Sequence, residues 1–194
     1  MKKIIFDLDD TLYSDKDLRE RREEEILRFL EDRKTEYMKL KKNGKGTIES
    51  FKLMGFSRED FFRVMENVNI SLMKDILLIK ILKDLKKVYQ IYVLSNSSKK
   101  VVEKTLLQLG ILDIIDKYYC GESFKNEKPD EECFFMVEKG DICVGNSFRK
   151  DLEVPKNKGA ITILIGKENN KADFNIKNIY EITKILFIEE DLKS

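Results

Sequence analysis

Two carboxylates at a spacing of two follow the first apolar run of the sequence. Asp7 and Asp9 come directly after residues 4–6, and Thr11 continues the same spacing. In an extended segment both carboxylates point to one face, where they repel each other unless a cation lies between them. The motif therefore indicates acid–base or metal chemistry. An acidic turn in which Asp10 or Thr11 caps the next element is the structural alternative.

Further polar clusters follow later apolar runs. Ser95 and Asn96 follow the second run and offer hydroxyl and N–H groups at the start of an expected helix, where an anion can bind. Serine and asparagine are also ordinary helix caps, so this cluster alone is weak evidence. Lys128 precedes a proline in the next cluster, and Asn146 and Asp151 lie beyond the fourth run.

The elements that must position these residues are short apolar runs that alternate with amphipathic stretches. The runs have the length of buried parallel strands, and they span 4–6, 91–94, 118–120, 142–144 and 161–165. The helical patterns span 73–88, 99–109 and 129–137. This alternation predicts an α/β fold with a doubly wound, mostly parallel sheet, and ligands bind at the C-terminal edge of such a sheet.

Residues 14–72 interrupt the alternation and contain no convincing strand. The pattern predicts one long helix over 15–41, a stop at the glycines that follow, and two shorter helices, the second capped by Ser57. We therefore expect an α/β core made of 1–13 and 73–194, with an all-helical insert over 14–72. A lid over the site at the end of the first strand would explain an insert at this place.

Composition removes several classes of protein. The chain has 194 residues and no histidine, which excludes Ser-His-Asp and Cys-His catalysis. A net charge of +1 argues against a nucleic-acid-binding protein, and no apolar run is long enough to cross a membrane. Three cysteines without metal-ligand spacing indicate a reducing, cytoplasmic location. We expect Cys120 and Cys143 to be buried, and Phe124, Phe134 and Phe135 to belong to the core.

Taken in order along the chain, these motifs resemble the haloacid dehalogenase-like (HAD) hydrolase superfamily. Its members carry Asp-x-Asp-x-Thr after the first strand, Ser or Thr after the second, a Lys that usually precedes Pro, and a closing acidic motif. The resemblance implies a Rossmann-like HAD core, and the insert stands where the small helical (C1-type) cap of the phosphatase branch belongs.

By this resemblance, Asp7 is the nucleophile that forms an aspartyl-phosphate, and Asp9 is the general acid and base. Lys128 offsets negative charge, with Lys125 as its competitor for that role. The substrate-binding residues that the resemblance implies are Thr11, Ser95, Asn96 and Lys128. Mg²⁺ is the implied cofactor, and its implied ligands are Asp7, Asp9 through its backbone carbonyl, Asn146 and Asp151. Tyr13, Arg19 and basic residues of the insert are candidates for further substrate contacts.

Position 146 departs from the family pattern, because most members carry Asp there. Asp7, Asp9 and Asp151 give a formal charge of −3 against +3 from Mg²⁺ and Lys128, where one more aspartate would give −4. An amide oxygen coordinates Mg²⁺ without adding charge. We therefore expect weaker metal binding but not a loss of activity.

The presence of Asp9 favours phosphoester hydrolysis over dehalogenation, because an alkoxide leaving group needs a proton and a halide does not. The expected substrate is a small phosphorylated metabolite, and we expect no nucleic-acid or membrane partner and a monomer or small homo-oligomer. Two alternatives stay open: a phosphomutase of the same fold, and a non-catalytic phosphate-binding module with a weakened metal site.

Overall fold

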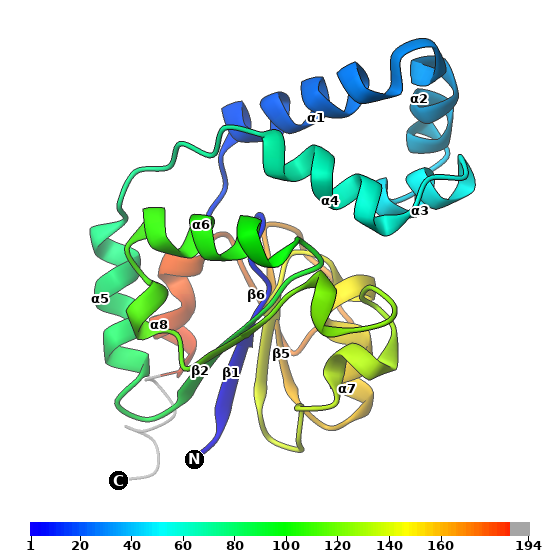
Figure 1. Ribbon diagram of the computed structural model, residues 1–194. Helices are drawn as coiled ribbons and strands as arrows, with labels where there is room; N and C mark the ends of the chain where they lie inside the picture. The colour runs from blue at the N-terminus through cyan, green and yellow to red at the C-terminus, as the bar shows by residue number, and fades with distance from the viewer. Residues whose placement is uncertain (187–194) are drawn as a thin grey trace, which may run out of the picture. The chain divides into compact units, whose positions relative to one another are not determined.

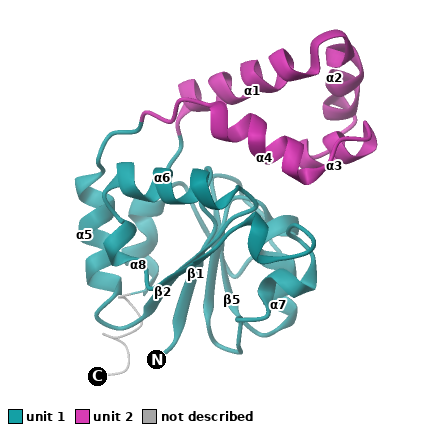
Figure 2. Cartoon of the chain, viewed as in Figure 1, with its two compact units in different colours: residues 1–14, 72–194 teal, residues 15–71 magenta. Residues whose placement is uncertain are grey.

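The chain divides into two compact units, which Figure 2 distinguishes by colour. One unit consists of residues 1–14 and 72–194, and the other of residues 15–71. The structure, a computed structural model, describes residues 1–186. Residues 187–194, which the sequence prediction includes in the core, lie outside the described part.

The larger unit is built on a parallel sheet. Within residues 1–186, six strands form this sheet in the order β3-β2-β1-β4-β5-β6, which confirms the predicted α/β fold with a parallel sheet. β1 is central, with Ile5 paired to Tyr92 on one side and to Cys143 on the other. The strands are β1 (Lys3–Phe6), β2 (Gln90–Leu94), β3 (Lys117–Tyr119), β4 (Ile142–Gly145), β5 (Ile161–Ile165) and β6 (Phe174–Ile176).

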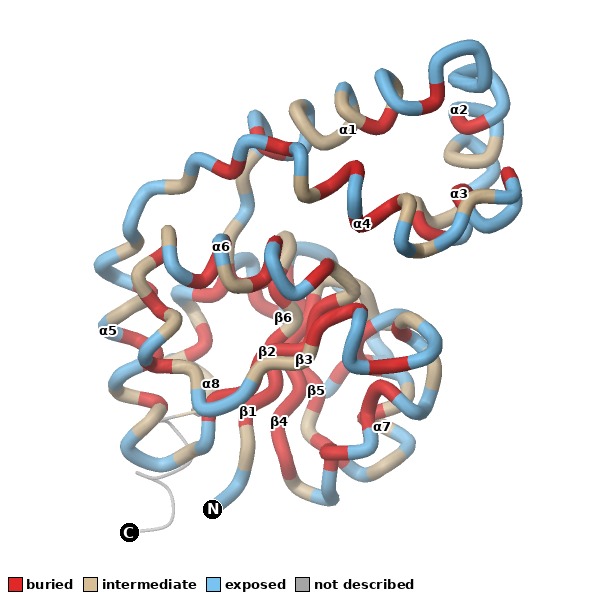
Figure 3. The backbone as a smooth tube through the Cα atoms, in the orientation of Figure 1, coloured by how far each residue is buried: buried red, intermediate tan, exposed pale blue. Residues whose placement is uncertain are grey.

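Helices cover both faces of the sheet (Figure 1), and the alternation of side chains along the strands shows how. Ile4 and Phe6 join one apolar core, with α5 (Ile76–Leu85), α6 (Lys99–Leu109) and α8 (Ile182–Leu186). Ile5 joins the other, with the 3₁₀ helix η4 (Glu131–Phe134) and the helical turn η5 (Phe148–Leu152), which continues into α7 (Glu153–Asn157). The central strands are buried on both faces (Figure 3), as their unbroken apolar runs predict.

Sequence and structure differ at several places in this unit. The helix expected over 73–88 covers only 76–85, because the Asp75 carboxylate caps its start by accepting from the N–H of Leu78. β6 escaped the sequence analysis because it is a three-residue edge strand whose central Asn175 is exposed. The α-helix expected over 129–137 is instead the short η4, whose turns close through i to i+3 bonds such as Cys133 N–H to Asp130 O.

The geometry of η4 decides which neighbouring side chains reach the core. Cys133 and Phe134 point inward and are buried, whereas Phe135 is 60% exposed. The expectation that Phe135 belongs to the core is therefore wrong. Its ring packs edge-on against Tyr119 at the surface, with centroids 5.5 Å apart. Buried positions are confirmed for Phe124, Phe134, Cys120 and Cys143. Cys133 is buried as well, and the three cysteines, all within the described residues, form no disulfide.

The smaller unit is helical. Residues 15–71, all of them described, contain no strand. The single long helix expected over 15–41 is divided, because Glu31 adopts a φ of 44° and ends the first helix. The turn allows Tyr37 to meet the buried Phe51 ring, with centroids 6.4 Å apart. The helices are α1 (Lys16–Leu30), η1 (Glu31–Arg33), α2 (Lys34–Lys42), α3 (Thr47–Leu53) and α4 (Arg58–Asn67).

The predicted start of α4 is confirmed in detail. The Ser57 hydroxyl accepts from the N–H of Asp60 at 3.0 Å, and the Asp60 carboxylate accepts from the N–H of Ser57 at 2.8 Å. This reciprocal pair is a capping box with aspartate in the place of glutamate.

No helix among residues 1–186 combines the length and apolar character needed to cross a bilayer.

Asp173 connects the segment before β6 to β5. Its Oδ2 accepts from the N–H and hydroxyl of Thr162 at 2.9 and 2.7 Å, and its Oδ1 accepts from Lys156 Nζ at 2.7 Å. Burial acts to raise the pKa of Asp173, but the bonds from Lys156 and Thr162 outweigh it and lower this pKa. The unfolded chain therefore binds a proton more readily, so the ionised carboxylate stabilises the fold above about pH 4.

We predict that Asp173→Asn lowers the free energy of unfolding by about 1–2 kcal/mol at pH 7, because it weakens hydrogen bonds to a charged group. The difference from the wild type should shrink as the pH falls below about 4, where the aspartate becomes protonated. Urea unfolding at pH 3 and at pH 7 measures the free energy of unfolding of both proteins, and Asp113→Asn, at an exposed position, is the control. A difference that is equal at pH 3 and pH 7 would contradict the prediction.

Candidate active site

The C-terminal edge of the central strands carries the predicted site residues. Asp7 directly follows β1, and its N–H continues the ladder by donating to Val144 O at 2.9 Å. Ser95 follows β2 in the same way, with its N–H donating to Tyr119 O at 3.0 Å. Asn146 follows β4. Because β2, β1 and β4 are neighbours in a parallel sheet, their polar ends meet at one edge.

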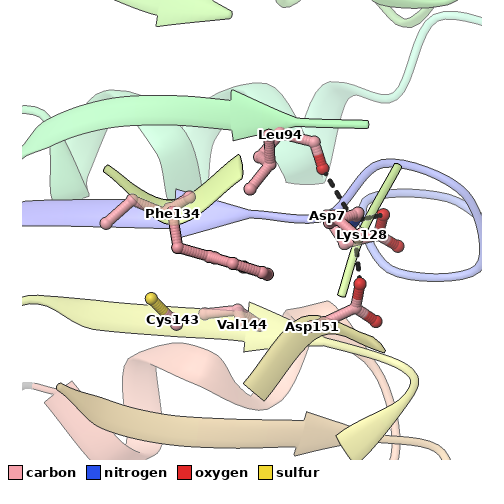
Figure 4. Close-up of a pocket in the computed structure, with 8 residues that line it drawn as sticks. Asp7, Leu94, Lys128, Phe134, Cys143, Val144 and Asp151 are labelled. Carbon is pink, nitrogen blue, oxygen red and sulfur yellow. Dashed lines mark hydrogen bonds and ion pairs between the residues drawn. The ribbon is translucent and has the colours of Figure 1, made fainter. Parts of the chain in front are cut away.

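Lys128 connects two of the acidic residues. Its ammonium group donates to Asp7 Oδ1 at 2.7 Å, to Asp151 Oδ1 at 2.8 Å and to the backbone oxygen of Leu94 at 2.9 Å (Figure 4). These bonds use all three protons of the ammonium group. The side chains of Lys128, Asp7 and Asp151 are only 4%, 12% and 6% exposed. Lys125, the competing lysine, is exposed.

The side chain of Asn96 holds Lys128 in place. Its Oδ1 accepts from the backbone N–H of Lys128 at 2.8 Å, and its Nδ2 donates to the backbone oxygen of the same residue at 3.3 Å. This paired contact links the segment after β2 to the segment that carries the lysine. The resemblance implies that Asn96 binds the substrate. In the structure, both polar atoms of its side chain bond to the backbone of Lys128. Substrate binding by Asn96 stays a prediction.

Apolar side chains surround the charged groups, and this burial shifts the pKa values of Asp7 and Lys128. Burial raises the pKa of Asp7 to about 7, because the charge of Lys128 offsets only part of the desolvation and Asp151 adds repulsion. Burial alone would lower the pKa of Lys128, but the charges of Asp151 and Asp7 raise it above its ordinary value. The lysine therefore stays protonated. A small pocket here is lined by Asp7, Lys128 and Asp151, and by Ile5, Leu94, Phe134, Cys143 and Val144.

Thr11 and Ser95 hold other parts of the site. The Thr11 hydroxyl donates to Asp7 Oδ2 at 2.9 Å, so the two oxygens of Asp7 are bound by different partners. The Ser95 hydroxyl is buried and accepts from the N–H of Ser97 at 3.1 Å. Both residues thus lie within the site that the motifs predict, and their contacts to a substrate stay predictions.

Asp9 has two hydroxyl partners. The Tyr13 hydroxyl donates to its Oδ1, and the Ser97 hydroxyl donates to its Oδ2 at 3.2 Å. From the sequence, Tyr13 was expected only as a substrate contact, and Ser97 was expected to have no role. Nothing in the spacing shows the contact to Ser97, because that residue lies 88 positions away and meets Asp9 only when the sheet forms.

Gly145 is required by the close approach of Asp151. A Cβ atom at position 145 would lie 2.4 Å from the Cβ and 2.8 Å from the Oδ2 of Asp151. Asp151 Oδ2 also accepts from the N–H of Ser147 at 3.0 Å, which fixes the carboxylate against the end of β4. Asn146 lies between Gly145 and Ser147 in the sequence and is partly buried.

The donor set fits Mg²⁺ in chemistry, but the described side chains do not form a complete cage. Among residues 1–186, no group of three or more acidic, His or Cys side chains converges as a metal site. Mg²⁺ is commonly bound through one or two carboxylates, with waters and substrate phosphates as the other ligands. Asp7 and Asp151 supply two carboxylates. When both are ionised, their charges exceed the single positive charge of Lys128 by one. Burial and this excess together raise the pKa of Asp7.

We predict that Gly145→Ala lowers the free energy of unfolding by about 1–3 kcal/mol, because the added methyl group overlaps the buried Asp151 side chain. Gly44→Ala is the matched control. It introduces the same group where nothing lies within 4 Å, although the φ of 79° adds backbone strain. Chemical denaturation measures both variants. A smaller loss for Gly145→Ala than for Gly44→Ala would contradict the role given to Gly145.

Solved structures share this fold over nearly the whole chain. The chain is similar to a HAD phosphatase from Thermococcus onnurineus, with 21% identity, a TM-score of 0.68, and coverage of 96% of this chain and 98% of the other. It is similar to β-phosphoglucomutase from Clostridium difficile, with 19% identity, a TM-score of 0.67, and coverage of 100% and 97%. The magnesium-bound YfnB of Bacillus subtilis, described as a HAD-hydrolase, gives 17% identity, a TM-score of 0.66, and coverage of 96% and 98%.

At these identities the likeness establishes the fold alone. The comparison with curated proteins yields no significant match. The sequence profile of the haloacid dehalogenase-like hydrolases matches residues 4–140, which is more than half of the chain. The matched region contains the first three motifs of the resemblance, with Asp7, Asp9, Thr11, Ser95 and Lys128; the closing motif, with Asn146 and Asp151, lies beyond it. The chain therefore belongs to the haloacid dehalogenase-like hydrolase family.

Proposed function

We propose that this hydrolase is a Mg²⁺-dependent phosphatase that acts on a small phosphorylated metabolite through an aspartyl-phosphate. The observation that carries the proposal is the buried Lys128 ammonium group, which bonds to both Asp7 and Asp151 while Asp9 lies two residues beyond Asp7. A carboxylate nucleophile, a fixed positive charge and a separate acid are what a two-step phosphoryl transfer needs.

In the first step, an oxygen of Asp7 forms a bond to phosphorus while the bond from phosphorus to the leaving oxygen breaks. Asp9, in its acid form, gives its proton to that oxygen, so the product leaves as an alcohol. In the second step, Asp9 takes a proton from water as the water oxygen bonds to phosphorus. The bond between Asp7 and phosphorus breaks, inorganic phosphate leaves, and both aspartates return to their starting states.

Asp9 supports phosphoester hydrolysis over dehalogenation. A halide leaves without a proton, whereas an alkoxide or phenolate leaving group gains from one. Asp9 lies close enough to the site to bond to Ser97, two residues beyond Ser95. A phosphomutase would use the same residues, but it would require a bisphosphorylated sugar and would release no phosphate.

Asp7, Asp151, the Asn146 amide and the backbone carbonyl of Asp9 are the groups that would hold Mg²⁺. When bound, the ion would supply positive charge to the phosphoryl oxygens. Position 146 offers a neutral oxygen, which brings no charge to a cluster in which two carboxylates already face one lysine. The second candidate, a phosphate-binding module without turnover, starts from the same neutral position and differs in assuming that the weakened metal site no longer supports catalysis.

The helical unit of residues 15–71 is inserted directly after the loop that carries Asp7 and Asp9. We assign it the role of a small C1-type cap that limits water access and selects the substrate. A small soluble substrate, without a nucleic-acid or membrane partner, accords with the near-neutral charge of the chain. A cytoplasmic location accords with its three cysteines, which form no disulfide. A monomer or small homo-oligomer remains part of this proposal.

Replacement of Asp7 tests the function directly. We predict that the purified protein hydrolyses p-nitrophenyl phosphate or a member of a phosphometabolite panel with Mg²⁺, and that EDTA stops the reaction. Asp7→Asn should lower kcat by about 10³-fold or more, because the amide is not a nucleophile. Asp10→Asn is the matched control; Asp10 lies in the same loop and accepts from Ser14 instead. Wild-type turnover no higher than that of Asp7→Asn would contradict the proposal and favour the non-catalytic module.

The charge at position 146 gives a second test. Asn146→Asp should lower the Mg²⁺ concentration for half-maximal rate by about tenfold, because one more carboxylate strengthens binding by roughly 1.4 kcal/mol. Asn157→Asp, which adds the same charge at an exposed position, should leave this concentration unchanged. Magnesium titrations of the initial rate measure both. An unchanged or higher concentration for Asn146→Asp would refute the charge argument.

A further inference from the structure

The carboxylate of Asp9 is held on both oxygens by hydroxyl groups. Tyr13 binds Oδ1, and Ser97 binds Oδ2 at 3.2 Å. The two hydroxyls come from different parts of the chain: Tyr13 lies in the loop after β1, and Ser97 lies between β2 and α6. Bonds at both oxygens restrict rotation of the carboxylate about its bond to Cβ.

The loop after β1 brings Tyr13 back to Asp9. The carbonyl of Leu8 accepts from the N–H groups of Thr11 and Leu12 at 3.4 and 3.1 Å, and Asp10 adopts a φ of 57°. This tight turn places the backbones of Asp9 and Tyr13 in an isolated parallel bridge. The two side chains can therefore bond although they are only four residues apart.

Ser97 is fixed by bonds of its own backbone. Its N–H donates to the Ser95 hydroxyl at 3.1 Å, and its carbonyl accepts from the N–H of Gly121 at 2.8 Å. The position of its side chain is thus set by β2 and by the segment after β3. Asp9 is consequently oriented by its own loop on one side and by the neighbouring strand ends on the other.

We propose that Tyr13 and Ser97 are positioning residues that orient the Asp9 carboxyl group for proton transfer to and from the reacting oxygen. The inference rests on the proposed phosphatase function and deepens it. In that reaction Asp9 must alternate between acid and base. In the base form, each hydroxyl group donates to one carboxylate oxygen. In the acid form, one hydroxyl still donates to the unprotonated oxygen, while the single O–H of the carboxyl group is free to turn toward the leaving group.

The test separates proton donation from folding and substrate binding by comparing two similar substrates. Phenyl phosphate releases phenol, whose pKa is near 10 like that of tyrosine, so its departure gains from a proton. p-Nitrophenyl phosphate has nearly the same shape, but its leaving anion is stabilised by the nitro group and depends less on Asp9. The value of kcat/KM covers the steps up to cleavage of the bond between phosphorus and the leaving oxygen. Slow hydrolysis of the phosphorylated enzyme therefore does not mask an effect on proton donation.

We predict that Tyr13→Phe lowers kcat/KM for phenyl phosphate by about tenfold or more, and by a clearly smaller factor for p-nitrophenyl phosphate. Ser97→Ala should show the same difference between the substrates. Tyr180→Phe is the matched control, because Tyr180 donates to Asp75 at 2.6 Å in another tyrosine–aspartate pair, and we give neither residue a role in the reaction. Its kcat/KM values should stay at the wild-type level.

Equal losses on the two substrates for both Tyr13→Phe and Ser97→Ala would overturn the inference, because they would indicate a general structural effect. Unchanged values for both variants would overturn it as well. Either result with an active wild-type enzyme leaves the phosphatase function standing. An inactive wild type would instead refute the proposed function itself, so the two failures are distinguishable.

Discussion

The buried ion cluster of Lys128 with Asp7 and Asp151 is the constraint on which the rest of the structure depends. Three charged side chains lie almost out of solvent, and such burial is costly unless the charges are paired and hydrogen-bonded. The fold meets this requirement with parts from four places: the end of β1, the Leu94 carbonyl of β2, the Asn96 amide that holds the lysine backbone, and η5 after β4. Because Gly145 has no side chain, Asp151 can approach the backbone at the end of β4.

The same cluster explains why the site is suited to an anion and a cation together. Two carboxylates against one ammonium group leave a negative excess, and burial next to a second acid raises the pKa of Asp7. A divalent cation would turn this excess of one negative charge into one positive charge, which would attract a phosphoryl group. Asp9 is bound separately, by Tyr13 and Ser97. The proposed nucleophile and the proposed proton donor thus have different hydrogen-bond partners although they are two residues apart.

Much of this arrangement can be predicted from the sequence. The rest cannot, and the reasons are physical. Apolar runs predicted five strands, and the parallel order brought their polar ends to one edge, as for Asp7 and Ser95. The three-residue β6 carries too little pattern to detect. The break at Glu31 lets Tyr37 pack against Phe51, a contact between two helices that periodicity within one helix does not contain. The contacts of Asn96 and Ser97 join residues far apart in sequence, so no local spacing encodes them.

The central claim is that Asp7 becomes covalently phosphorylated during turnover. The most direct test is to quench the wild-type enzyme in acid during steady-state hydrolysis of p-nitrophenyl phosphate and to locate the phosphoryl group by peptide mass spectrometry. We expect one added phosphoryl group on Asp7 in the peptide that contains it, and none on this peptide in Asp7→Asn. Turnover in which the phosphoryl group is found on another residue would contradict this claim.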